Sequence, residues 1–494
     1  MLNTAVQKIM GLGFLDYSIL GIALLILFAI TYIKGKNEED TKDFFLGRRQ
    51  TPMWVACLSF VATEISAMTI VGVPAVGFKE NWQYLQFFIG SAAARLIIAY
   101  LFIPAFYKYN CTTIYEFLKH RFGAGTQYSG SIFFFITRLL ASGVRLYAAS
   151  LAVSVIMGWD MKMTLLFFTV ISMAFIGFGG IKAVVWTGAF EAITFYIAGI
   201  GIAVYLLLNI QGGFLEFWQV AGEAGKLSIF NFAWNVKDPN ILLIAVINGV
   251  VGSMAAFGTD QEMMQRLLTV DTRASSQKTL VATIFASFPL VVLYLGIGTL
   301  LFVFYQQNPS LPLPENSDKI ISHFTFYILP AGLKGLILTA IILASIDSPL
   351  SSLSSSFVTD IYRPLLVKNK TEKYYLFVSR ISVIVFALIL AVTAFLCQSI
   401  EGMLWLAFKI NGVTAGSLLG VFLLGLLTKR HANKANIFAM IFGAVSMGIL
   451  LYLSETGKIG LGWSWLIVIG TFTTFVLGYL LGPIMDGKKA EIMP

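Results

Sequence analysis

A stretch of the chain around residue 64 places polar groups inside an otherwise apolar segment. Glu64, Ser66 and Thr69 lie among Val, Ala, Ile and Met residues, and Gly72-Val73-Pro74 follows one turn later. Proline removes a backbone donor and leaves an upstream carbonyl without its helical partner. Irregular backbone in a deeply apolar environment persists only where it lines a cavity or binds an ion. A proline-kinked helix whose hydroxyls bond back to their own backbone accounts for Ser66 and Thr69, but not for the carboxylate of Glu64.

A second polar stretch surrounds Asp347. The segment Ala344-Ser345-Ile346-Asp347-Ser348-Pro349 leads into a serine-rich run that ends at Ser356. Small hydroxyl residues allow close helix packing, which accounts for the later serines. A carboxylate, however, costs about 2.5–3.5 kcal/mol to insert at the centre of a membrane helix. Oxygen ligands without nearby Cys or His are typical of sites for hard cations, so the stretch predicts such a site.

Two arginines lie in a third apolar segment and need anionic partners. Arg138, Ala141, Ser142 and Arg145 recur at the spacing of one helical face. The carboxylates in other apolar segments are Glu64, Asp260 and Asp347. We expect internal pairing to be favoured, because buried charges are normally neutralised within the protein. Binding of a solute carboxylate is the alternative.

The composition shows what surrounds these groups. Of the 494 residues, 57% are hydrophobic and only 12% are charged, and the mean hydropathy is +0.82. Soluble proteins carry about 25% charged residues, so a soluble enzyme, a disordered chain and a disulfide-stapled module are excluded. The net charge of +9 comes from 34 Lys and Arg that form no long run, so we expect no nucleic-acid partner. The three cysteines and three histidines show no metal-binding or disulfide spacing.

Thirteen apolar stretches are long enough to cross a membrane. A bilayer core about 30 Å thick requires about 20 apolar residues in a helix. The stretches lie near residues 14–33, 52–77, 82–107, 128–157, 161–180, 183–209, 241–265, 274–305, 331–357, 375–398, 401–427, 432–454 and 460–483. No connection between them is long enough for a soluble domain. We therefore predict an all-α polytopic protein of the cell (inner or plasma) membrane, with a single transmembrane domain over residues 1–494.

The basic residues predict the orientation of the chain. Lys and Arg are enriched in short loops on the cytoplasmic side of a membrane. Twenty-one of the 34 fall on the face of the first connection and seven on the opposite face. Thirteen spans place the two termini on opposite faces, so we expect the N-terminus outside and the C-terminus in the cytoplasm.

Two discontinuous regions in comparable positions indicate a transporter built from inverted repeats, with a binding site near the midplane of the membrane. These regions are the second span and the region from the seventh to the ninth span. With 14–33 as a peripheral helix, we expect residues 52–209 and 241–427 to form two five-helix repeats. Residues 432–483 would then form two peripheral C-terminal helices. The sequence shows no residue-level similarity between the repeats, so this division depends on spacing alone.

A motif and several accompanying stretches occur in a recognisable order. The motif is Gly258-Thr259-Asp260-Gln261 followed by Gln265-Arg266. The accompanying stretches are Asp43-Phe44-Phe45-Leu46-Gly47-Arg48-Arg49, Thr113-Ile114-Tyr115-Glu116-Phe117-Leu118, Arg121-Phe122-Gly123, Gly179-Gly180-Ile181, Trp186-Thr187, residues 329–336 and Asp360-Ile361-Tyr362. Together they resemble the sodium:solute symporter family, which includes carriers of glucose, proline, pantothenate, monocarboxylates and sialic acid. The resemblance covers about residues 40 to 430 and implies a LeuT-like fold with two inverted five-helix repeats.

The resemblance also implies a sodium site between the second and ninth spans. The residues carried over to this site are Ala62, Ile65, Ile341, Ala344 and Ser345. Ala344 stands where many members have a serine, so one hydroxyl ligand is missing. Asp347 is a further candidate ligand, because some members use this position for an additional sodium site. Gly188 stands where those members have a carboxylate. The alternative to a role of Asp347 in sodium binding is that Asp347 pairs with Arg138 or Arg145.

For the solute, the resemblance implies a pocket on the broken second span and its neighbours. Phe88 stands where some members have a polar residue, which disfavours a heavily hydroxylated sugar. Arg138 and Arg145 flank Ala141, which stands where sialic acid carriers have a carboxylate-binding arginine. An anionic carboxylate or a sugar acid is therefore expected. The residues predicted to bind the solute are Glu64, Ser66, Thr69, Tyr84, Gln86, Phe88, Arg138, Arg145, Asp260 and Ser348.

We therefore predict a secondary active symporter that imports a small organic solute together with sodium by alternating access. The chain contains no nucleotide-binding motif that would indicate ATP drive. It also contains no nucleophile–base or metal constellation, so we expect no catalytic residues and no enzymatic activity, and no obligate protein partner is evident. Two alternatives remain. One is a proton-coupled symporter on the same fold, with Glu64 or Asp347 as the proton carrier, and the other is a non-transporting solute sensor.

Overall fold

The computed structural model describes residues 11–35, 41–234, 238–346, 349–397 and 403–487, and no strand occurs in these ranges. Ten helices are long and apolar enough to cross a membrane, and two bent helix pairs each provide one further span. A shorter apolar helix covers Met161–Ile176, in the region of the fifth predicted span. Each of the thirteen predicted stretches therefore corresponds to a helix, to a bent pair or to this shorter helix.

The helices of the first half of the chain run from α2 to α11. They are α2 (Phe14–Lys34), α3 (Thr41–Leu46), α4 (Met53–Glu64), α5 (Ala67–Lys79), α6 (Leu85–Ile97), η3 (Ile98–Phe102), α7 (Ile103–Lys108), α8 (Tyr115–Phe122), α9 (Ala124–Met157), α10 (Met161–Asn209) and α11 (Gly213–Glu223). Helix α10 is kinked at Gly180, where φ is 49°. Glycine adopts this conformation without steric cost, and the kink separates the fifth predicted span from the sixth.

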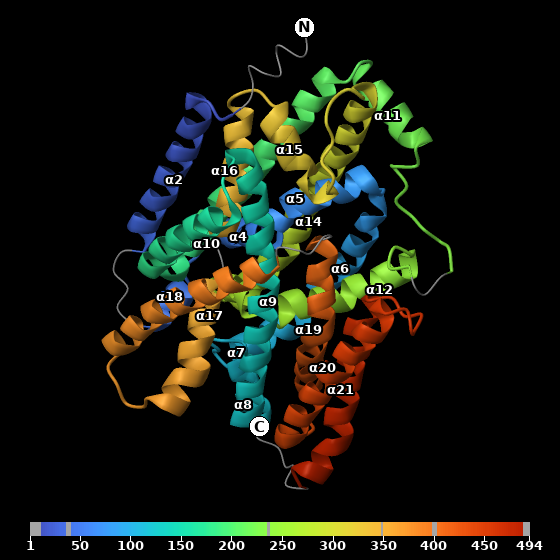
Figure 1. Ribbon diagram of the computed structural model, residues 1–494. Helices are drawn as coiled ribbons and strands as arrows, with labels where there is room; N and C mark the ends of the chain where they lie inside the picture. Colours follow the sequence, from blue (N-terminus) through green and yellow to red (C-terminus); the bar gives the residue numbers. More distant parts are fainter. Residues whose placement is uncertain (1–10, 36–40, 235–237, 347–348, 398–402, 488–494) are drawn as a thin grey trace.

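The second half completes the bundle. Its helices are α12 (Leu242–Ser253), η4 (Met254–Gly258), α13 (Gln261–Leu268), α14 (Arg273–Gln307), α15 (Ile320–Tyr327), α16 (Leu333–Ile346), α17 (Leu350–Ser356), η6 (Phe357–Leu366), α18 (Glu372–Leu396), α19 (Met403–Leu427), α20 (Asn433–Glu455) and α21 (Ser464–Met485). Figure 1 shows α9 running through the middle of the molecule, with α2 to one side and α20 and α21 to the other. Helices α11 and α15 lie at its upper end, and α8 lies at its lower end.

The two bent spans are the second and the seventh of the predicted series. Helices α4 and α5 meet at 58°, and the η4 end of the seventh span meets α13 at 64°. The first bend is at Ile65 and Ser66, so Pro74, which lies inside α5, is not the point where the helix breaks. At the second bend, Asp260 accepts a hydrogen bond from the backbone N–H of Glu262 (2.8 Å) and caps α13. An N-terminal cap of this kind restarts a helix in a new direction.

Close packing fixes the helices around the bends. Gly90 of α6 and Gly249 of α12 lie so close together that a Cβ atom on Gly90 would approach the Val246 carbonyl oxygen to 2.2 Å. The close approach of these two helices therefore requires glycine at this point.

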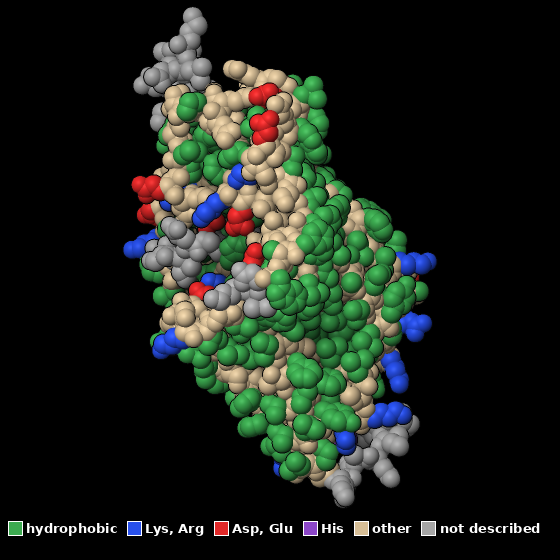
Figure 2. All heavy atoms as spheres, turned by 90° about the vertical axis from the view of Figure 1, so that its right-hand side faces the viewer, with side chains coloured by type: hydrophobic (Ala, Val, Ile, Leu, Met, Phe, Trp, Pro, Cys, Tyr) green, Lys and Arg blue, Asp and Glu red, His purple; other side chains and the backbone are tan. Residues whose placement is uncertain are grey.

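The outer surface is largely apolar, and Figure 2 shows hydrophobic side chains over most of one face with charged side chains gathered toward its edges. The repeat boundaries 52–209 and 241–427, and the peripheral helices, stay predictions.

Candidate ion and solute site

Two cavities border the bend between α4 and α5. The smaller has a volume of about 40 Å³, and the larger has a volume of about 190 Å³. Residues of the bend alternate between them, with Ala62 and Ser66 lining the smaller cavity and Ile65 and Thr69 lining the larger. Arg145 of α9 lines both cavities. A space of 40 Å³ suits an ion or a few water molecules, whereas the larger one suits part of an organic solute.

The smaller cavity contains three of the residues predicted to bind sodium. Ala62 from the last turn of α4 and Ala344 and Ser345 from the end of α16 all line it. The hydroxyl of Ser345 donates a hydrogen bond to the carbonyl of Ile341 (3.1 Å). Because α4 ends at Glu64, the last carbonyls of this helix have no partner one turn further along the chain. The fifth predicted residue, Ile65, lines the larger cavity.

Hydroxyl groups supply most of the other oxygens around the smaller cavity. Ser66 and Ser142 are buried, and their hydroxyls have no hydrogen-bond partner among the described residues. Thr169 and Ser172 of α10 line the same cavity. Carbonyl and hydroxyl oxygens without thiol or imidazole groups are the ligands that hard cations such as sodium prefer. The donor set therefore fits a sodium ion.

Two carboxylates of the smaller cavity were absent from the sequence prediction. Glu191 of α10 and Glu262 of α13 both line it, and both are almost fully buried. Glu191 lies within the apolar stretch 183–209, so the rule that singled out Glu64 and Asp347 would also have found it. Glu262 lies in the apolar stretch 241–265, two residues after Asp260, and only Asp260 of this pair was predicted to take part in the site. Asp347 and Ser348 lie outside the described residues.

Seven of the residues predicted to bind the solute line the larger cavity. They are Glu64, Thr69, Tyr84, Phe88, Arg138, Arg145 and Asp260. The structure also adds residues from the C-terminal helices that sequence reasoning missed. These are Phe408, Asn411 and Gly412 of α19 and Trp463 and Ile467 at the start of α21. Phe408 lies within the expected second repeat and Trp463 lies beyond it, and neither carries a sequence signal that separates it from lipid-facing aromatic residues.

Gln86 is buried but is held by the segment that precedes α12. Its side-chain amide donates to the carbonyls of Gln83 (3.1 Å) and Asn240 (2.6 Å). Its amide oxygen accepts a hydrogen bond from the backbone N–H of Asn231 (3.1 Å). The polar atoms of Gln86 are thus engaged within the protein, and the residue is outside the lining of both cavities. We therefore drop Gln86 from the solute site.

Glu64 is engaged in an ion pair. Its carboxylate pairs with Arg95 of α6 and accepts a hydrogen bond from the hydroxyl of Ser287 on α14 (2.5 Å). Arg95 is fully buried, donates to Ser91 (2.8 Å), and has its guanidinium carbon 5.2 Å from the ring centre of Phe88. The charge of Glu64 is therefore neutralised within the wall of the larger cavity.

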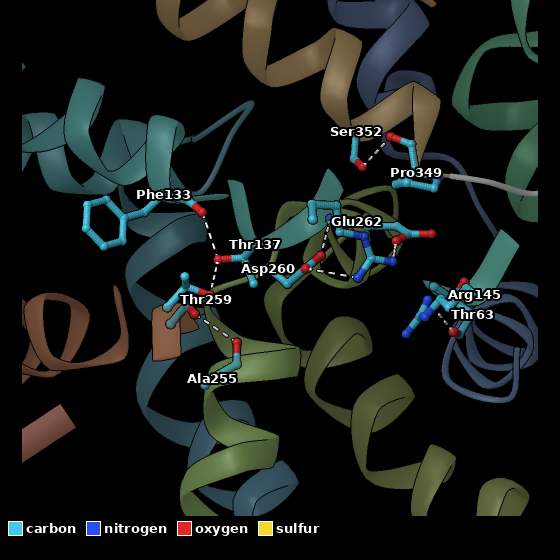
Figure 3. A network of polar contacts seen from close by, with 12 residues as sticks. Thr63, Phe133, Thr137, Arg145, Ala255, Thr259, Asp260, Glu262, Pro349 and Ser352 are labelled. Carbon is cyan, nitrogen blue, oxygen red and sulfur yellow. Dashed lines mark hydrogen bonds and ion pairs between the residues drawn. The ribbon is translucent and has the colours of Figure 1, made fainter. Parts of the chain in front are cut away.

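Arg138 is paired internally, as the sequence predicts. Its guanidinium lies 3.2 Å from the Asp260 carboxylate and also forms an ion pair with Glu262. Arg266 lies 3.9 Å from Glu262 and donates to the hydroxyl of Ser59 (3.1 Å). Figure 3 shows the side chains of Asp260 and Glu262 close together at the second bend. The cluster joins α9 to α13 and balances two guanidinium groups with two carboxylates.

Arg145 has no internal ion pair among the described residues, although such a pair was expected for both arginines of this helix face. Its one hydrogen bond within the described residues is to the Thr63 carbonyl, at 3.5 Å, and none of their carboxylates pairs with it. In Figure 3 it lies beside Thr63, apart from the Asp260–Glu262 cluster. A guanidinium group in this position is available to bind an anion.

Comparison with known proteins identifies the family. The family model described as "Sodium:solute symporter family" matches residues 44–443. The sodium/sialic acid symporter NanT of Aliivibrio fischeri is 29% identical over 96% of this chain and 94% of its own length. The sodium/sialic acid symporter SiaT of Proteus mirabilis is 27% identical over 97% and 96%, respectively.

A solved structure supports the fold. The substrate-bound, outward-open structure of a Na⁺-coupled sialic acid symporter superposes with a TM-score of 0.87 at 25% identity. The match covers 97% of this chain and 100% of that one, and it confirms the predicted all-α, LeuT-like fold. Together with the match over residues 44–443, it leads to one conclusion: the chain belongs to the sodium:solute symporter family, whose members couple the movement of a small solute across a membrane to that of sodium.

Proposed function

We propose that this symporter imports an organic anion together with sodium, and that Arg145 binds the carboxylate of the solute. One observation supports this most strongly. Arg145 lines both cavities and has no ion pair within the described residues, whereas Arg138 is paired with Asp260 and Glu262. A partly buried guanidinium without a counter-ion carries a desolvation cost, and a carboxylate arriving in the larger cavity would offset it. Sialic acid, named for two relatives, also carries a carboxylate.

For sodium, we propose the smaller cavity, with Ala62, Ala344 and Ser345 among the ligands. The carbonyls of Ile65 and Ile341 and the side chain of Asp347 stay predicted sodium ligands, and Ser348 stays a predicted residue of the solute site. Sodium in this position would join the end of α4 to the end of α16, and so favour one arrangement of the two repeats, 52–209 and 241–427. A ligand shifts such an equilibrium only through its different affinity for the two states.

Arg145 lines both cavities, and this suggests how the binding of sodium is coupled to the binding of the organic anion. Sodium in the smaller cavity adds positive charge beside a residue that also lines the larger one. This charge strengthens the binding of an anion in the larger cavity, where water is scarce and charges interact strongly. By linkage, the anion increases sodium affinity by the same factor. The inward sodium gradient then drives uptake, with about 2.3 kcal/mol per charge per 100 mV from the membrane potential.

We further propose that the lower face of Figure 1 is cytoplasmic, since the loops around α8 contribute to the more basic face of the chain. Family membership favours sodium over protons as the driving ion, and transport over sensing without transport. No covalent step is needed for this activity, so we propose no catalytic residues, and we propose that the chain needs no protein partner.

A thermal-shift experiment tests the solute assignment. Purified protein in detergent would be melted with monocarboxylates, sugar acids, amino acids and neutral sugars, each with sodium and with potassium. We expect stabilisation by carboxylates that is larger in sodium. Arg145→Gln should abolish it, and Arg145→Lys should keep part of it. Equal stabilisation of Arg145→Gln and the natural protein by the same carboxylate would contradict the proposal.

A further inference from the structure

One wall of the larger cavity consists of stacked aromatic rings, and we call Tyr84, Phe87, Phe408 and Trp463 the aromatic wall. The rings of Phe87 and Phe408 stack with centres 6.3 Å apart and planes 12° from parallel. Phe408 and Trp463 stack at 5.6 Å and 13°, and Tyr84 contacts Phe87 at 6.0 Å. All four residues line the cavity. Three separate parts of the chain, at α6, α19 and the start of α21, thus converge to make one apolar, aromatic part of the cavity lining.

Most polar groups of the same cavity are engaged within the protein. Ser91 accepts a hydrogen bond from Arg95 (2.8 Å), and Asn248 donates to the Ser464 carbonyl (2.6 Å). The charges of Glu64, Arg138 and Asp260 are neutralised in the ion pairs described above. The cavity-lining polar side chains for which no hydrogen bond occurs within the described residues are Thr69, Tyr84, Ser253, Asn411 and, through its indole N–H, Trp463.

The small number of polar side chains without hydrogen bonds limits which solutes the larger cavity can bind. A polyhydroxylated molecule loses many hydrogen bonds to water when it enters a site, and each hydroxyl left without a partner costs free energy. Five polar side chains without hydrogen bonds of their own cannot replace the water around a sugar acid with many hydroxyls. A flat apolar body, in contrast, gains contact area and ring stacking against the aromatic wall. Specific pockets of this type combine an apolar lining with a few polar anchors.

We infer that the solute is a carboxylate with an aromatic or other flat apolar body. Its body packs against the aromatic wall and its carboxylate binds Arg145, so the carrier selects against polyhydroxylated sugar acids such as the sialic acid named for its relatives. This inference rests on the proposed function, because it places the carboxylate on Arg145. It also gives the C-terminal helices α19 and α21 a direct role in specificity.

Equilibrium binding to the purified full-length chain in sodium tests the inference. The probes are phenylacetate, indole-3-acetate and N-acetylneuraminate. We expect the two aromatic carboxylates to bind at least tenfold more tightly than N-acetylneuraminate. Trp463→Ala should weaken the binding of both aromatic probes at least fivefold, and Trp463→Phe should retain most of it. Trp218→Ala, on the exposed surface of α11, is the matched control and should change nothing.

The possible outcomes distinguish the role of the aromatic wall from the role of Arg145. If N-acetylneuraminate binds as tightly as the aromatic probes or more tightly, and Arg145→Gln weakens it, the inference is wrong and the proposed function stands. If Trp463→Ala has no larger effect than Trp218→Ala while both proteins remain folded by their melting curves, the aromatic wall does not contact the solute. If Arg145→Gln leaves the binding of every carboxylate unchanged, the proposed function itself is wrong.

Discussion

Arg138 of α9 and Asp260 at the second bend are joined by an ion pair, with 3.2 Å between Nη1 and Oδ2. The same guanidinium pairs with Glu262, and Asp260 also caps α13. One arginine therefore fixes both the direction of α13 and its position against α9. The finding assigns Arg138 to the framework around the cavity and leaves Arg145 as the basic residue available to a solute.

Arg138→Gln should strongly destabilise the protein. The substitution leaves Asp260 and Glu262 buried with fewer positive partners, and breaking a buried pair from one side costs about 3–5 kcal/mol. Denaturation in detergent, followed by tryptophan fluorescence, measures the effect. The control is Arg363→Gln, whose pair with Glu372 is about half exposed and should contribute less than about 1 kcal/mol. Equal losses in the two variants would contradict the structural role of Arg138.

Glu64→Gln should lower stability without removing the dependence of uptake on sodium. The substitution breaks the buried pair with Arg95 but keeps an oxygen that accepts from Ser287. Adding Arg95→Gln should recover part of the lost stability, because the lone buried charge disappears. Melting curves measure the first effect, and uptake by proteoliposomes at equal pH on both sides measures the second. If Glu64→Gln makes uptake independent of sodium but dependent on a pH gradient, Glu64 takes part in ion coupling.

Ser345→Ala should weaken the apparent affinity for sodium. A lost neutral oxygen ligand has an effect similar to that of a lost hydrogen bond, about 0.5–1.5 kcal/mol, or about two- to tenfold in affinity. Sodium-dependent protection against thermal unfolding measures the change. Ser354→Ala is the matched control, because its hydroxyl bonds to the Ser379 carbonyl (2.9 Å) and to Ser382. A sodium affinity that changes equally in both variants would exclude Ser345 from the site.

Stability should fall in acid partly through His323 of α15, which lies outside the membrane-spanning helices. Burial lowers the pKa of His323 below its ordinary value of 6.5, and its Nδ1 atom is buried without a partner among the described residues. The unfolded chain then binds a proton more readily than the folded chain, so this contribution destabilises the protein as the pH falls below 6.5. Melting temperatures at pH 7.5 and 5.5 should differ less for His323→Gln than for the natural protein. An unchanged difference would exclude His323 as a source of the acid sensitivity.

The sequence was sufficient to predict the spans and the segment of the broken helix, because both depend on long apolar runs and their interruptions. The LeuT-like fold, in contrast, was predicted from the family resemblance of the motifs. The position of the first break was harder to predict. Pro74 is the strongest helix-breaking residue in the segment, yet α5 continues through it, and the bend is at Ile65 and Ser66. Tertiary packing decides this point, because Pro74 lies against Gly298 of α14, and such contacts between distant parts of the chain leave no local pattern.

The partners of individual charges were equally hard to predict. Arg138 and Arg145 share one helical face and look equivalent in the sequence, but only Arg138 lies beside the second bend. Gln86 looked like a residue of the solute site, yet it bonds to Asn231 and Asn240. In each case, the difference depends on which distant segment packs against the helix.

Sodium-driven uptake in proteoliposomes tests the central claim most directly. The purified chain would be reconstituted with equal pH on both sides, and accumulation of a labelled aromatic carboxylate would be followed with an inward sodium gradient or with sodium equal on both sides. We expect accumulation above equilibrium only with the gradient, and its loss in Arg145→Gln vesicles that contain equal amounts of folded protein. Equal uptake with and without the sodium gradient would contradict the account.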